Sequence, residues 1–73
     1  MTKMTQDLVR IVSAGGGVQV DASLKLTDDL VRIAAAARQS GARIEIKNSG
    51  RKLTQDLVRV ASAGGGNVLF LDL

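Results

Sequence analysis

A chain of 73 residues with a mild formal net charge of +3 is long enough for one small domain. Cysteine and histidine are absent and Phe70 is the only aromatic residue, which excludes disulfides, metal sites built on Cys or His, and an aromatic platform for nucleic-acid bases. We therefore expect a single domain over residues 1–73, without cofactors, whose core consists of Val, Leu, Ile and Ala side chains.

One phrase of six residues, Thr-(Gln or Asp)-Asp-Leu-Val-Arg, occurs three times and begins at Thr5, Thr27 and Thr54. Threonine is a good helix N-cap, and the aspartate two residues later lies where the helix dipole favours negative charge. An apolar residue before each threonine stands five positions ahead of a valine, which is the spacing of a hydrophobic staple. The phrases predict three helices and one supersecondary unit used three times. The three units span residues 4–26, 27–50 and 53–73.

Glycines mark the predicted helix ends. The triplets at 15–17 and 64–66 follow the first and third helices, and Gly41 follows the second. Glycine adopts a positive φ without a Cβ penalty, so it commonly ends helices. A phosphate-binding loop lies between a strand and a helix, whereas these triplets come between a helix and a strand. We interpret them as helix stops.

Alternating apolar residues predict a strand after each helix. The inward residues of the first two strands are Val18, Val20, Ala22, Leu24 and Leu26, and then Ala42, Ile44 and Ile46. The third strand, over residues 67–73, breaks the alternation. Val68 and Phe70 match the inward set, whereas Leu69, Leu71 and Leu73 fall on the face that is polar in the other two strands.

The predicted fold class is α/β, with the order αβαβαβ. Crossovers between parallel strands are right-handed in nearly all proteins, so helices that lie on one face require the strand order 1-2-3. The alternative order 2-1-3 places helices on both faces, which would require two apolar faces. The polar outward sets of the first two strands favour a three-stranded parallel sheet in the order 1-2-3 with its helices on one face.

The loop between the second strand and the third helix is the best candidate for ligand binding. It lies at the carboxyl edge of the sheet, where open α/β sheets bind ligands, and leads to a helix N-terminus that can hold an anion. The alternative interpretation is a solvated turn of typical turn residues. The candidate anion-binding residues are Lys47, Ser49, Gly50, Arg51, Lys52 and Thr54.

The last strand predicts self-association, because natural sheets protect an apolar edge with charge, proline or a cover. The self-association residues are Leu69, Phe70, Leu71 and Leu73. A homodimer can pair two such strands edge to edge in antiparallel fashion, or pack the leucine rows face to face. A fragment whose next unit has been removed would leave the same apolar row.

The sequence favours a non-enzymatic, structural α/β module that forms a homodimer through its C-terminal strand. The close agreement between the copies is typical of an engineered or consensus-like sequence. A small anion- or nucleic-acid-binding domain that uses the basic loop 47–52 is the alternative, although the mixed charges argue against nucleic acid. No run approaches the ~20 apolar residues of a membrane span, and no signal peptide is apparent, so we expect a cytoplasmic protein without a membrane partner.

Overall fold

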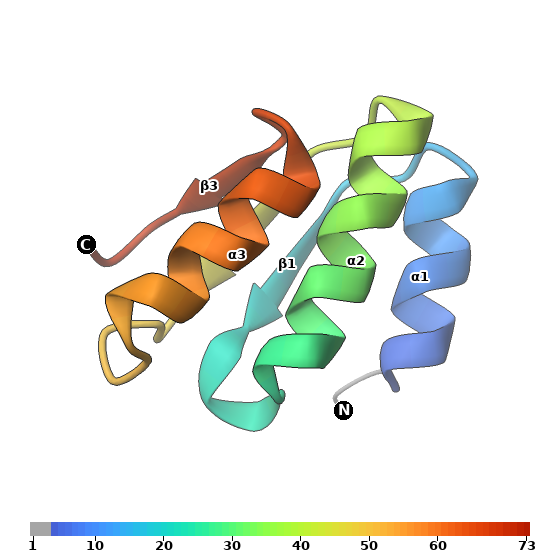
Figure 1. Cartoon of the computed structure of the whole chain (residues 1–73). Coiled ribbons are helices and arrows are strands. Elements are labelled where there is room, and N and C mark those ends of the chain that lie inside the picture. The colour runs from blue at the N-terminus through green and yellow to red at the C-terminus, as the bar shows by residue number, and fades with distance from the viewer. Residues whose placement is uncertain (1–3) are drawn as a thin grey trace.

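The computed structural model describes residues 4–73, in which helices and short strands alternate (Figure 1). The elements are α1 (Thr5–Ser13), β1 (Val18–Asp21), the 3₁₀ turn η1 (Ala22–Leu24), α2 (Thr27–Ser40), β2 (Ile44–Lys47), α3 (Thr54–Gly64) and β3 (Val68–Phe70). The predicted αβαβαβ order is confirmed. Within this part of the chain, every helix is too short or too polar to cross a membrane.

The three strands form one parallel sheet in the order β1-β2-β3. Val18, Ile44 and Val68 are level with one another at the starts of the strands. All three helices lie on one face of the sheet, as Figure 1 shows, and α2 lies between α1 and α3. The order 1-2-3 is therefore confirmed over 2-1-3, and within residues 4–73 the second face of the sheet carries no helix.

The core lies between the sheet and the helical layer. Its inward strand residues follow the predicted period of two: Val20, Ile44 and Ile46 are buried. The helices contribute the residues that recur at helical spacing, and α2 contributes most because it is the middle helix. The largest fully buried apolar side chains are Leu30, Ile33, Ile44, Ile46, Val12 and Val60.

Glycines cap the second and third helices as predicted: Gly41 is the C-cap of α2 with φ 80°, and Gly65 is the C-cap of α3 with φ 56°. The first helix differs, because its C-cap is Ala14 in right-handed conformation and Gly15, with φ 99°, comes one residue later. Gly64 has a different reason to lack a side chain. A Cβ at this position would collide with the Cγ2 atom of Val68, so α3 and β3 approach each other more closely than an alanine allows.

The prediction that the threonines cap the helices is wrong. The N-cap residues are Met4, Leu26 and Leu53, each with extended backbone, and no side chain makes a capping hydrogen bond. Each threonine is already the first helical residue, one position too late for its hydroxyl to cap. These three apolar residues are largely exposed, so the expected staple contacts bury little surface.

The predicted length of the first strand is also wrong. The Asp21 carboxylate accepts hydrogen bonds from the Ser23 backbone N–H at 2.9 Å and from the Ser23 hydroxyl at 2.6 Å. These bonds turn the chain into η1 directly after β1. Ala22 is buried as predicted, but Leu24 is 61% exposed and Leu26 is 73% exposed, so neither points into the core.

Candidate functional site

The loop between β2 and α3 is tightly turned at the carboxyl edge of the sheet. Asn48 has a positive φ of 58°, a conformation that asparagine tolerates better than most residues. The next residue, Ser49, is completely buried, and its carbonyl accepts a hydrogen bond from the Lys52 N–H at 3.0 Å. This turn aims the backbone N–H groups of Ser49 and Gly50 at one point.

The carboxylate of Asp72 occupies that point. It accepts the Ser49 N–H at 2.9 Å, the Ser49 hydroxyl at 2.7 Å and the Gly50 N–H at 3.1 Å. Two convergent backbone N–H groups and a hydroxyl form a typical anion cradle. The loop thus has the anion-binding geometry that the sequence suggested, but the anion is a side chain of the same protein.

The hydrogen bonds hold Asp72 in its charged form. The bond from the Ser49 hydroxyl is the largest cause that lowers the pKa of Asp72 below its ordinary value of 3.8, and the N–H groups of Ser49 and Gly50 act in the same direction. Partial desolvation opposes them but is weaker than the leading bond. The link between β3 and the loop is therefore strongest when this carboxylate is ionised.

A second hydrogen-bonded link joins this loop to the end of β1. The Asn48 side-chain amide donates to Asp21 at 3.0 Å, and the Lys52 ammonium donates to the Lys25 carbonyl at 3.0 Å. The pKa of Asp21 is also lowered, first by the Ser23 hydroxyl, with smaller contributions from Asn48 and others. The carboxyl ends of all three strands are thus tied together.

The predicted anion-binding residues do not converge on an open site. Ser49 and Gly50 donate to Asp72, and the ammonium of Lys52 donates to the carbonyl of Lys25. Lys47 and Arg51 are exposed, whereas Thr54 lines a groove beside α3 instead of the loop. Sequence reasoning missed Asp72 because its partner Ser49 is 23 residues away and no local pattern links the two.

The predicted association residues divide between two faces. Leu69 and Leu71 are exposed, and Phe70 is half-buried against the core. Leu73 does not continue the outward row, because β3 ends at Phe70 and the chain bends afterwards. It lies instead with Phe70 in an open groove of about 400 Å³ on the outer side of α3. We name this the α3 groove; its lining residues are Thr54, Leu57, Val58, Ala61, Phe70 and Leu73.

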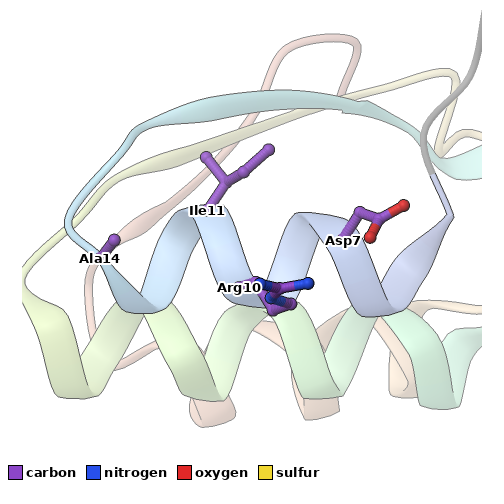
Figure 2. A pocket seen from close by; sticks show the side chains of 4 residues that line it. All are labelled: Asp7, Arg10, Ile11 and Ala14. Atoms are coloured by element: carbon purple, nitrogen blue, oxygen red, sulfur yellow. The ribbon is translucent and has the colours of Figure 1, made fainter.

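A second open groove, which the sequence did not reveal, lies at the other end of the helical layer. It has a volume of about 410 Å³ and runs along α1 (Figure 2). We name this the α1 groove; its lining residues are Asp7, Arg10, Ile11 and Ala14. The two grooves therefore flank the three-helix layer, one at each end.

Between residues 4 and 73, no three Asp or Glu side chains gather closely enough to hold a metal ion. Fold and site together define a two-layer α/β domain with a tied carboxyl edge and two open flanks. Comparison with protein-family models, curated proteins and solved structures finds no match to this chain.

Proposed function

We propose that this protein is a non-enzymatic structural module that associates with further copies of itself through the end of the domain that holds β3. The observation that carries this proposal is the uncovered edge of β3, with apolar side chains on both of its sides. The Asn67 carbonyl and the Leu71 N–H bond to β2. Because alternate residues of a strand direct their polar backbone groups to opposite edges, those of Val68 and Phe70 point to the free edge.

The side chains around this edge favour a protein partner. Leu69 and Leu71 are exposed, and the α3 groove is mostly apolar. An unpaired strand edge flanked by apolar surface is a ready template for another chain. A small domain without disulfide or metal also gains stability when it buries such surface by association.

The non-enzymatic part of the proposal rests on chemistry. The chain has no His and no Cys. At the edge where an α/β sheet normally binds ligands, the carboxylates of Asp21 and Asp72 already accept bonds from the protein's own loops. Neither carboxylate is buried in the way that raises a pKa for general acid catalysis.

The alternative function, anion binding at the basic loop, has weaker support. An external anion would have to displace Asp72 from the N–H groups of Ser49 and Gly50. The remaining cations, Lys47 and Arg51, are exposed. Self-association is therefore the function that the geometry supports best.

The test is the solution mass by light scattering over a wide range of protein concentration. The wild type is compared with the double variant Leu71→Lys/Leu73→Lys, which adds charge beside β3. The matched control, Ala35→Lys/Gln39→Lys, adds the same charges at two exposed positions of the middle helix α2. We expect the wild type and the control to exceed the mass of one chain, and the β3 variant to remain at one chain. A wild type that stays at the mass of one chain throughout would rule out the proposal.

A further inference from the structure

The two open grooves occupy related positions on different helices. Alignment of the three repeated phrases relates every helical position to its counterparts in the other two helices. The residues of the α3 groove that lie on α3, namely Thr54, Leu57, Val58 and Ala61, correspond to Thr27, Leu30, Val31 and Ala34 of α2. The residues of the α1 groove, namely Asp7, Arg10, Ile11 and Ala14, correspond to Asp56, Arg59, Val60 and Ala63 of α3.

Among the α2 counterparts, Ala34 lies where α2 meets α3. Ala34 is fully buried, and its Cβ lies 3.5 Å from the place where a Cβ on Gly64 of α3 would be. Leu30 is also fully buried, and Val31 packs against the core. On α3 the same positions lack a neighbouring helix in the described part of the chain: Val58 is 56% exposed and Ala61 is exposed.

The α3 counterparts of the α1 groove belong to the opposite side of the same interface. Arg59 reaches back to Asp28 of α2, with 3.1 Å between its Nη2 atom and the Asp28 Oδ1 atom, and Val60 is fully buried. On α1 the equivalent Ile11 is 42% exposed, although Ile33 at the same position in α2 is fully buried. Figure 2 shows the Ile11 side chain directed away from α2, on a side of α1 without a neighbouring helix.

The grooves are thus the two complementary halves of one helix–helix interface. From this correspondence we propose that copies of the protein associate head to tail, with α1 of one copy packed in the α3 groove of another. This proposal rests on the proposed self-association. It adds which surface of the second copy packs against β3 and α3 of the first, namely the one that carries α1. Each copy then supplies the helix that the end of the other lacks.

The sheet fits the same arrangement. Val18, Ile44 and Val68 begin their strands at one level, so a further parallel strand in this register places Val18 of the second copy beside Val68. α1 of the second copy would then lie over the new junction, on the helical face of the extended sheet. A two-fold dimer that pairs β3 with β3 would cover the α3 grooves of both copies and leave both α1 grooves open. Head-to-tail contact covers one groove of each kind at every junction, and it can form rings or longer chains.

Complementation between two blocked variants tests the arrangement. Ile11→Glu places a carboxylate in the α1 groove, and Val58→Glu places one in the α3 groove. Each residue is substantially exposed in a single copy, so we expect both variants to fold. Because an unpaired charge in an apolar contact is costly, each variant alone should weaken association by more than about tenfold. Ala35→Glu, at an exposed position of the middle helix α2 and outside both grooves, is the control and should associate as the wild type does.

An equimolar mixture of the two variants is the decisive sample. The Ile11→Glu copy keeps an intact α3 groove and the Val58→Glu copy keeps an intact α1 groove, so they should form a species with one chain of each kind. Native mass spectrometry with one variant isotope-labelled identifies this species. It should stop at two chains because both outer ends are blocked.

Two results would overturn the head-to-tail arrangement: unchanged association of Ile11→Glu, as in a β3–β3 dimer, or a mixture that remains at single-chain mass. Circular dichroism establishes that each variant is folded, and Ile11→Gln and Val58→Thr replace any variant that is not. A wild type that never associates refutes the proposed function itself, which distinguishes the two failures.

Discussion

Replacement of Gly64 by alanine should destabilise the domain, although alanine is the better helix former. Gly64 is the last residue of α3, and an added Cβ would collide with the Cγ2 atom of Val68 in β3. Ala34 on the other side lies at an ordinary contact distance of 3.5 Å and causes no conflict. The outcome therefore depends on one methyl group.

Two effects of known size compete at this position. Alanine is favoured over glycine by about 1 kcal/mol within a helix, and by less at a helix end. An extra carbon in a packed contact costs about 1–3 kcal/mol, and Val68 cannot turn its methyl away cheaply because β-branched side chains are restricted at χ1. We expect a net loss of about 1–2 kcal/mol, which lowers the melting temperature of a domain of this size by roughly 4–16 °C.

A double-mutant cycle isolates the collision. Val68→Ala removes the Cγ2 atom but keeps the Cβ, which lies at 3.4 Å from the added atom, an acceptable contact. In that background Gly64→Ala should be neutral or slightly stabilising, so the coupling energy should reach about 1–3 kcal/mol. Stability is measured by urea unfolding followed by circular dichroism, with the exposed Ser62→Ala as a control for helix propensity. Equal effects of Gly64→Ala in both backgrounds would refute the reasoning.

Three further predictions concern the tied carboxyl edge and the start of β3. The pKa of Asp72 in the folded state lies below its ordinary value of 3.8. The ionised carboxylate therefore stabilises the fold fully above pH 3.8, and this stabilisation is lost as the pH falls through the folded-state pKa. Asp72→Asn should reduce this loss of stability in acid, as judged by urea midpoints measured from neutral pH to about pH 2. Asp72→Ala should free the cradle, so that phosphate shifts the amide resonances of Ser49 and Gly50 in the variant but not in the wild type; shifts in both would show that Asp72 does not occupy the cradle. Asn67→Ala should cost about 1–2 kcal/mol because its amide donates to two carbonyls, one at the end of α2 and one before β2; an unchanged urea midpoint would contradict this.

The sequence predicted the architecture because its strongest signals are local and periodic. The three phrases mark where Thr5, Thr27 and Thr54 enter helices, and the glycines mark where those helices end. Polar residues on one side of Val18–Asp21 and Ile44–Lys47 correctly indicated helices on a single face. Local sequence pattern and tertiary packing agree at these positions, so the local pattern was enough to predict the helices and the side of the sheet on which they lie.

The remaining features depend on contacts that no local pattern encodes. The alternation of apolar and polar residues continues through Leu24 and Leu26, which predicted a longer strand. The strand ends early because the Asp21 carboxylate accepts a hydrogen bond from the Ser23 N–H and the chain turns into η1. The partner of the basic loop, Asp72, comes from beyond β3. Exposed Ile11 has the same local sequence as its buried counterparts, because its exposure follows from the absence of a neighbouring element.

The central position of β2 has a consequence for hydrogen exchange. Both edges of β2 are paired, whereas β1 and β3 each leave one edge open. Amides of β1 and β3 can exchange after local detachment of one strand, but β2 opens fully only when both neighbours have left it. Its slowest amides should therefore report the opening free energy of the entire domain. Occupation of either outer edge by another chain converts that edge strand into an inner one, so slow exchange should spread outward from β2 to the strand that has gained a neighbour.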